Sequence, residues 1–135
     1  MKKMIVGIFL ITVSFSALAA NNCSVIGFHE PGTHTYDGPT WCEKVNFDNV
    51  IVRGPLQVDS SRIGGLVDVS GPVTASKSQF NSIQIENNFT AEKITLNNNT
   101  EVKGNIVFLG PKGTVMIDPT SKVIGSIING NVKKP

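Results

Sequence analysis

The sequence has little net charge, few aromatic residues and no long apolar run beyond its N-terminus. Its 135 residues include 12 Lys plus Arg and 10 Asp plus Glu, and 7% of them are aromatic. Lys2 and Lys3 lie in a segment that we expect to be removed, which leaves equal numbers of basic and acidic side chains. A neutral chain lacks the positive surface that nucleic acids and anionic membranes require, so neither is an expected partner. The length suits one domain, and no second segment is long enough to span a bilayer.

The N-terminal segment, residues 1–19, has the three parts of a secretory signal peptide. Met1 to Met4 is short and basic, Ile5 to Ala17 is mostly apolar, and Ala17-Leu18-Ala19 offers the small residues that signal peptidase reads. The apolar part is shorter than the roughly 20 residues of a membrane-spanning helix. We therefore expect cleavage after Ala19 or Ala20, and a bacterial protein that is secreted or periplasmic.

From residue 45 onward the sequence repeats a short template at a nearly constant spacing. The template is an apolar residue, any residue, Gly or Asn, any residue and a second apolar residue, and it recurs roughly every 17 residues, with a longer last interval. The five matches are Val52–Leu56, Val69–Val73, Ile85–Phe89, Val102–Ile106 and Val123–Ile127. Apolar and polar residues alternate here without helical periodicity, as in short strands. Such a period predicts a β-solenoid, in which each coil covers the apolar side of the next.

We therefore expect an all-β fold, a small β-solenoid of about five coils of 16–17 residues over residues 45–135. The first apolar residues of the five matches would form one interior column, and the last apolar residues would form another. The middle position would be a corner, because Gly and Asn most readily accept a positive φ. The predicted corner residues are Gly54, Gly71, Asn87, Gly104 and Gly125. On the outer surface, Glu86 would stack against Lys103, and Glu101 against Lys122.

Residues 20–44 differ from the repeats, and we predict that they form an N-terminal cap loop. This segment contains the only Tyr and the only Trp of the chain, both histidines and the only two cysteines, Cys23 and Cys42. In an oxidising compartment these cysteines would form a disulfide that closes a loop of about 20 residues and stabilises the fold by roughly 3 kcal/mol. A metal-binding or catalytic thiol is the weaker alternative, because nothing in the spacing places a base beside either cysteine.

The two ends of a solenoid expose unpaired backbone groups, so their protection decides whether the protein associates. Only Lys and Pro residues protect the C-terminal end, and Val107, Ile124 and Ile128 would expose apolar area near it. We predict an interaction surface at these three residues, through which the protein associates with itself or with another exported protein.

Three other groups of residues give weaker indications of a binding or catalytic site. Tyr36 and Trp41 would stack on sugar rings if they do not simply cover the core. Asp59 and Glu92 would occupy equivalent positions two coils apart, near the upper separation of an inverting carboxylate pair. The histidines lack the spacing of a metal site. We predict no catalytic residue, no metal and no cofactor.

The Val- and Ile-rich coils with Gly corners, ending in Lys122-Val-Ile-Gly-Ser-Ile-Ile-Asn-Gly-Asn-Val132, resemble the bactofilins, a family of polymer-forming bacterial cytoskeletal proteins. The resemblance covers residues 45–132. It implies a right-handed triangular β-helix that associates end to end without nucleotide. The chain departs from this family in its signal peptide, its disulfide-closed cap and its smaller number of coils.

The sequence thus favours an exported, non-enzymatic structural or interaction module that self-associates through its C-terminal coils. A secreted cell-surface or glycan-binding module is the first alternative, and a β-helical enzyme acting on glycans is the second.

Overall fold

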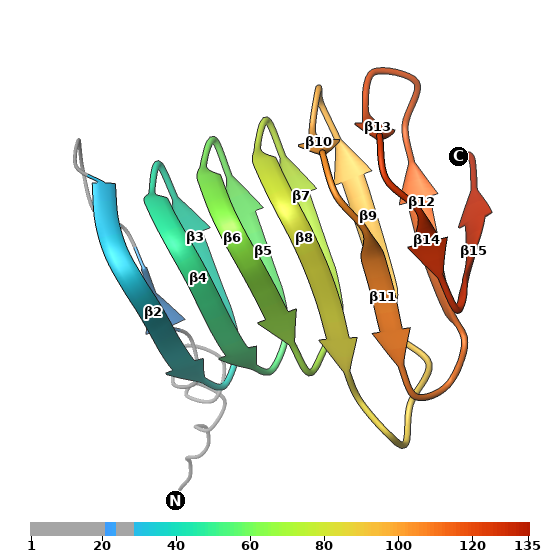
Figure 1. The fold of residues 1–135 in the computed structure, drawn as a ribbon, viewed down its shortest axis with the longest axis horizontal. Helices are drawn as coiled ribbons and strands as arrows, with labels where there is room; N and C mark the ends of the chain where they lie inside the picture. The colour runs from blue at the N-terminus through green and yellow to red at the C-terminus, as the bar shows by residue number, and fades with distance from the viewer. Residues whose placement is uncertain (1–20, 24–28) are drawn as a thin grey trace, which may run out of the picture.

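Every regular element in the described part of the chain is a β-strand. The computed structural model describes residues 21–23 and 29–135, so the predicted signal peptide at residues 1–19 lies outside the described residues. The strands stack side by side along the long axis, with the first coil at one end and the last coil at the other (Figure 1). The predicted all-β solenoid is therefore confirmed.

One sheet contains seven parallel strands, one from each of six coils and the short strand Asn21–Asn22 at the N-terminal end. Each strand pairs only with its counterparts in the neighbouring coils, and the strands follow one another along the axis in their sequence order. Their order is β1 (Asn21–Asn22), β3 (Thr40–Glu43), β5 (Leu56–Asp59), β7 (Val73–Ser76), β9 (Lys93–Asn97), β12 (Gly113–Ile117) and β15 (Gly130–Lys133).

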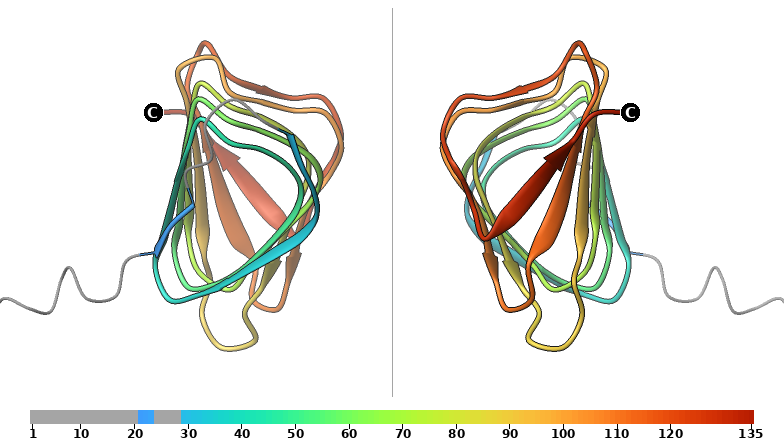
Figure 2. Two further views of the ribbon diagram at one scale, coloured as in Figure 1. Left: turned by 90° about the vertical axis from the view of Figure 1, so that its left-hand side faces the viewer. Right: turned by 90° about the vertical axis from the view of Figure 1, so that its right-hand side faces the viewer.

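The other sheet is bent, so that it forms two sides of the solenoid. Strand β8 (Gln79–Glu86) pairs with β10 (Glu101–Val102) through Gln79 and Phe80, and with β11 (Ile106–Leu109) through Ile83 to Glu86. Shifts of register mark the same bend between the longer strands. Viewed along the axis, the coils superpose as roughly three-sided loops (Figure 2). The strands are β2 (His29–Asp37), β4 (Asn46–Arg53), β6 (Arg62–Val69), β8 (Gln79–Glu86), β10 (Glu101–Val102), β11 (Ile106–Leu109), β13 (Lys122–Val123) and β14 (Ile127–Ile128).

The described residues make six coils, and the predicted cap loop is wrong for residues 29–43. Strand β2 pairs in register with β4, and β3 pairs with β5, so this segment is the first coil. The sequence pattern did not predict this coil, because polar or aromatic residues occupy its interior positions. His34 stands where the next coil has Val50, Tyr36 where it has Val52, and Thr40 where it has Leu56.

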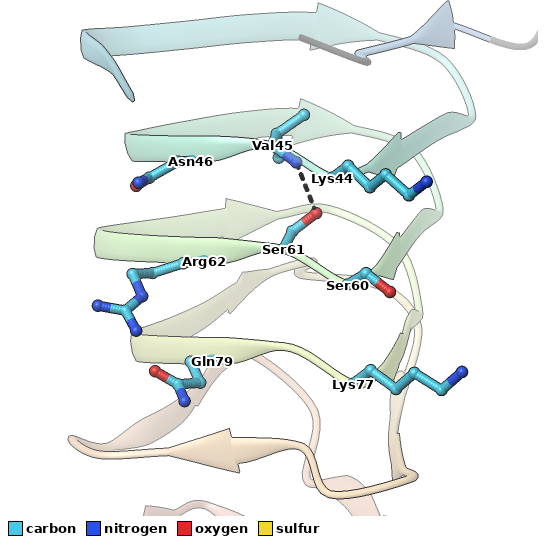
Figure 3. Close-up of a pocket in the computed structure, with 8 residues that line it drawn as sticks. All are labelled: Lys44, Val45, Asn46, Ser60, Ser61, Arg62, Lys77 and Gln79. Carbon is cyan, nitrogen blue, oxygen red and sulfur yellow. Dashed lines mark hydrogen bonds between the residues drawn. The ribbon is translucent and has the colours of Figure 1, made fainter. Parts of the chain in front are cut away.

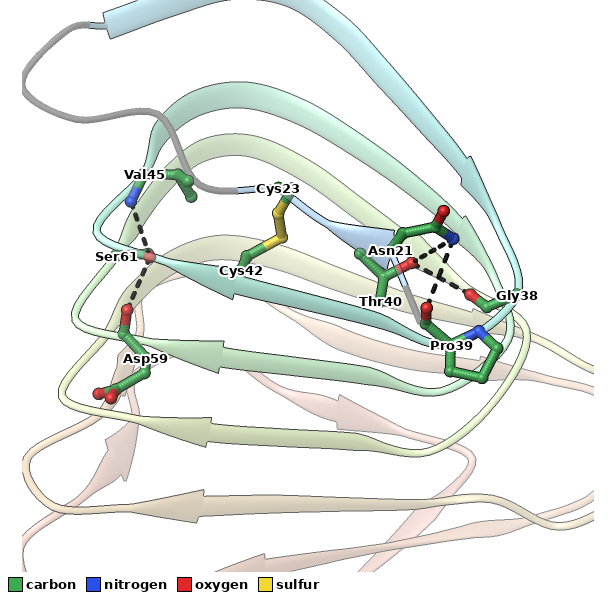
Figure 4. The surroundings of a disulfide bond; sticks show 9 residues. All are labelled: Asn21, Cys23, Gly38, Pro39, Thr40, Cys42, Val45, Asp59 and Ser61. Atoms are coloured by element: carbon green, nitrogen blue, oxygen red, sulfur yellow. Dashed lines mark hydrogen bonds between the residues drawn. A yellow bond between two sulfur atoms is a disulfide. The ribbon is translucent and has the colours of Figure 1, made fainter. Parts of the chain in front are cut away.

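The predicted disulfide between Cys23 and Cys42 is confirmed, with Cα atoms 4.7 Å apart (Figure 4). It joins the residue after β1 to the middle of β3. Backbone hydrogen bonds from Asn21 N–H to the Pro39 carbonyl and from Cys23 N–H to the Trp41 carbonyl hold the same two segments together. Both cysteines are buried, so the bridge also closes the core at the N-terminal end.

The register of the first coils agrees with the sequence template, whereas that of the later coils does not. Val52, Val69 and Ile85 stack as predicted, each one coil after the last. The next residue in this column is Phe108, which lies farther along the chain than the expected Val102. Val102 instead stacks between Phe80 and Val123. The period therefore lengthens in the second half of the molecule.

A loop formed by residues 87–92 accounts for part of this change. It protrudes between β8 and β9 (Figure 1). Phe89 lies on this loop with 93% of its surface exposed, so it is not in the interior column to which the template assigned it. Ile94 takes that place and stacks on Val73. The template failed here because a loop of Asn, Phe and Thr matches the same short pattern.

The predicted corner residues divide between two corners. Gly54, Gly71 and Asn87 belong to one corner, whereas Gly104 and Gly125 stack on each other at another. The requirement at Gly71 is close approach of the backbone and not a positive φ. A Cβ built on Gly71 would lie 2.8 Å from the carbonyl carbon of Gly54, closer than real side chains approach.

At the third corner, positive φ occurs at residues other than glycine, namely Lys44, Ser60 and Lys77. The residues that directly follow Ser60 and Lys77 in the sequence carry hydroxyl groups, and these hydroxyls form a ladder along the axis. The Ser61 hydroxyl accepts a hydrogen bond from Val45 N–H and donates one to the Asp59 carbonyl (Figure 4). The same contacts link later coils through the hydroxyls of Ser78, Thr100 and Ser121. This ladder satisfies backbone groups at a bend, where the sheets do not.

The register can be tested with two phenylalanines. Phe80 is 1% exposed and lies in the core, so Phe80→Ala should lower the free energy of unfolding by about 3–5 kcal/mol. Phe89→Ala on the exposed loop should change it by less than about 0.5 kcal/mol. Chemical denaturation followed by circular dichroism measures both. Equal losses in the two variants would contradict the register.

Candidate functional site

The last coil ends the solenoid with unpaired strands. In the described residues, β13, β14 and β15 pair with β10, β11 and β12 on one side and with nothing on the other. Figure 2 (right) shows this end with β15 lying across the front. Its free N–H and C=O groups are therefore available to a further strand.

The interior of the solenoid is also uncovered at this end. Val132 is 50% exposed, although it stands in a core column. The residues before it in that column are all buried: Thr40, Leu56, Val73, Ile94 and Val115. Val123 and Ile127 end two further core columns and are only partly buried. Among residues 21–23 and 29–135, no further coil covers these core side chains.

The three residues predicted to form an interface all lie near this end. Val107 and Ile128 are in-register neighbours on the outer face of one side. Ile124 is 61% exposed and lies at the corner between β13 and β14. We use the name C-terminal face for β13, β14 and β15 with their exposed residues Ile124, Ile128 and Val132.

Sequence reasoning missed Val132 and Leu109, which are also exposed apolar residues. Val132 follows its partner Val115 at the same interval that separates Val69 from Val52, so the spacing could have found it. Leu109 stacks on Glu86. The interval between these two residues is longer than the period of the template, so the template did not predict the pair. Glu86 therefore does not stack against Lys103, whereas the predicted pair of Glu101 and Lys122 is confirmed at 3.4 Å.

The two residues predicted to stack on sugar rings, Tyr36 and Trp41, lie in different surroundings. Tyr36 lies in an interior column with Val52 and packs against the core. Burial, followed by the charge of Glu30, raises the pKa of its phenol. Trp41 points outward from β3, because Thr40 and Cys42 on either side of it point into the core. Only Trp41 is therefore presented to a ligand.

The predicted carboxylate column also separates. Asp59 is in register with Ser76, which pairs with Asn97, whereas Glu92 lies just before Lys93 at the opposite end of the strand. The Glu92 carboxylate accepts a hydrogen bond from the Asn87 amide. Asp59 and Glu92 therefore do not face each other across a substrate position.

The two histidines point to different surroundings. His29 Nε2 lies 2.7 Å from Asp48 Oδ1 on the surface. The His34 ring stacks on Phe47 with centroids 4.1 Å apart, and its buried Nε2 bonds to none of the described residues. No group of three potential metal ligands exists in the described parts of the chain.

A groove of about 460 Å³ runs over the corner that carries Lys44, Arg62 and Lys77. Figure 3 shows that Lys44 and Lys77 extend to one side of the corner, whereas Arg62 extends to the other side beside Gln79. The three cations therefore do not converge on a single ligand position, and this groove is a weak candidate for an anion site.

Two carboxyl groups approach each other on the outer face of the bent sheet. Burial of Asp68, together with its hydrogen bond to Glu86 and the charge of that residue, raises the pKa of Asp68 to about 6. The positive charge of Arg53 lowers the pKa of Asp68 and so offsets part of this rise. Neither carboxyl group lines the Lys44 groove.

The raised pKa of Asp68 predicts how stability depends on pH. The folded protein holds this proton more tightly than the unfolded chain, so the free energy of unfolding falls as pH rises from about 4 through 6. Asp68→Asn should therefore raise the melting temperature at pH 7.5, and the gain should vanish below about pH 4. Thermal denaturation of both proteins across this range measures the effect. An equal gain at every pH would contradict the assignment to proton binding.

No helix among residues 21–23 and 29–135 has the length and apolar character that crossing a membrane requires. Comparisons of the chain with protein-family models, with curated proteins and with solved structures gave no match.

Proposed function

We propose that this protein is an exported, non-enzymatic interaction module that associates with a second copy of itself through the C-terminal face. The exposure of Val132 at the end of a buried column carries this proposal. A further coil placed on β13, β14 and β15 would bury the ends of the core columns and pair the free backbone groups at the same time.

A second copy fits this face because its coils have the same outline and the same distances between strands. The charges support a contact between the last coil of one molecule and the first coil of the other. Lys133 and Lys134 lie beside the C-terminal face, whereas Glu30 and Asp37 lie on the first coil. Such a contact joins unlike surfaces and does not close on itself, so it would extend into a chain of molecules.

Export is supported by the predicted signal peptide and by the disulfide, because structural disulfides persist mainly in oxidising compartments. The absence of catalysis is supported by the separation of Asp59 from Glu92, which removes the carboxylate pair on which the enzymatic alternative rested.

Self-association can be tested with charges on the C-terminal face. Size-exclusion chromatography with light scattering, applied to the secreted protein over a range of concentrations, should show a mass that rises with concentration. The double variant Ile124→Asp, Ile128→Asp places two charges in the contact and should weaken association at least tenfold.

Phe89→Asp provides a control, since it puts one such charge on an exposed apolar residue away from this face. It should associate like the wild type, and circular dichroism should show that all three proteins are folded. A wild-type protein that stays monomeric at every concentration, or an equal loss in the control, would refute the proposal.

A further inference from the structure

A second surface feature lies near the opposite end of the solenoid and is independent of the C-terminal face. It is a groove of about 290 Å³ that crosses the first three coils. Prolines stacked in successive coils form one wall: Pro39, Pro55 and Pro72. The other wall is the outward column of Trp41, Gln57 and Thr74, which are in register. We call this the Trp41 groove.

The groove is rigid because the carbonyl groups of its prolines are hydrogen-bonded to the neighbouring coils. The carbonyl of Pro39 accepts a hydrogen bond from Asn21, that of Pro55 from Thr40 and that of Pro72 from Leu56. Proline also fixes φ and has no N–H to satisfy. A ligand in the groove therefore meets a preformed surface and orders little of the protein when it binds.

Trp41 is the only tryptophan in the chain, and 47% of its surface is exposed. Strand alternation places it outside, with Asn22 and Gln57 as its in-register neighbours on either side. Its indole ring thus remains open to solvent, next to side chains that donate and accept hydrogen bonds. An exposed indole beside such polar groups suits a ligand with both apolar faces and polar edges.

The charge of the groove narrows the class of ligand. All eight residues that line it are uncharged. The outward column that contains Trp41 remains uncharged from Asn22 to Thr95. In the coil of Thr95, Lys93 takes the position that the prolines hold in the earlier coils and so ends the proline wall. Two residues farther along the strands lie the carboxylates of Glu43 and Asp59, which would repel an anionic polymer. Phosphates, nucleic acids and acidic glycans are therefore disfavoured.

We propose that the Trp41 groove binds an uncharged polysaccharide, with one sugar ring stacked on Trp41 and hydroxyl groups bonded to Gln57 and Thr74. The C–H face of a sugar ring matches the indole, and its hydroxyls match the amide and hydroxyl side chains. Because equivalent residues recur about every 4.8 Å along the axis, the groove offers repeated contacts to a linear polymer. The groove lies on the outer side of the first three coils, whereas the proposed contact between copies uses the end faces of the terminal coils, so the two sites use different surfaces.

The single tryptophan makes a direct test possible. Uncharged hexasaccharides of β-linked glucose, mannose and N-acetylglucosamine are titrated into the full secreted protein, and the Trp41 emission is recorded. At least one of them should change the emission saturably and without dependence on added salt. A hexamer of galacturonic acid, which is anionic, serves as the charged comparison. If none of the uncharged sugars changes the emission, or only the anionic one does, the proposal is wrong.

Variants then assign the binding to the groove, with calorimetry as the readout because one of them lacks the fluorophore. Trp41→Ala should weaken binding of the uncharged hexasaccharide at least tenfold. Thr74→Val keeps the shape of the side chain and removes only its hydroxyl group, and it should weaken binding severalfold. Phe89→Ala removes an exposed aromatic ring outside the groove and should bind as the wild type does. Unchanged affinity in the folded Trp41→Ala variant would overturn the proposal.

Discussion

Parallel stacking of coils in register is the constraint on which the structure depends. Each strand bonds to the same segment of the coils before and after it, so a residue must suit its neighbour one coil away as well as its neighbours in sequence. Val52, Val69, Ile85 and Phe108 satisfy this requirement in the core. At the corners, where sheet bonds are interrupted, the hydroxyls of Ser61 and Ser78 bond the backbone of the preceding coil.

The same constraint makes the ends of the molecule different from its middle. A residue in a central coil is covered on both sides, whereas one in a terminal coil is covered on one side only. At the N-terminal end β1 and the disulfide cover part of the first coil, and Cys23 and Cys42 are buried. At the C-terminal end Val132 has no later residue above it among those described. The proposed contact between copies follows from this asymmetry.

Stacking also converts single side chains into ladders on the outer surface. Three prolines at one position make a continuous wall, and Trp41, Gln57 and Thr74 make another. Where like charges meet on neighbouring coils, as Asp68 does with Glu86, two residues beyond its in-register partner Gln84, the pKa of one carboxyl group rises. The outer surface of a solenoid is therefore patterned by columns, and a column without charge is distinct from its neighbours.

The sequence alone determined the all-β solenoid, the short regular period of its early coils, the disulfide and the presence of exposed apolar residues near the C-terminus. These features depend on local alternation and on regular spacing, which are visible in one dimension. The first coil escaped detection because His34, Tyr36 and Thr40 fill interior positions with residues that do not look like a core. Only the tertiary structure decided that Phe108 follows Ile85 in the core and that Phe89 does not follow Val73. It also decided that Trp41 and the prolines share a groove, because longer coils and inserted loops change the residue that lies above another, and that alignment exists only between neighbouring coils.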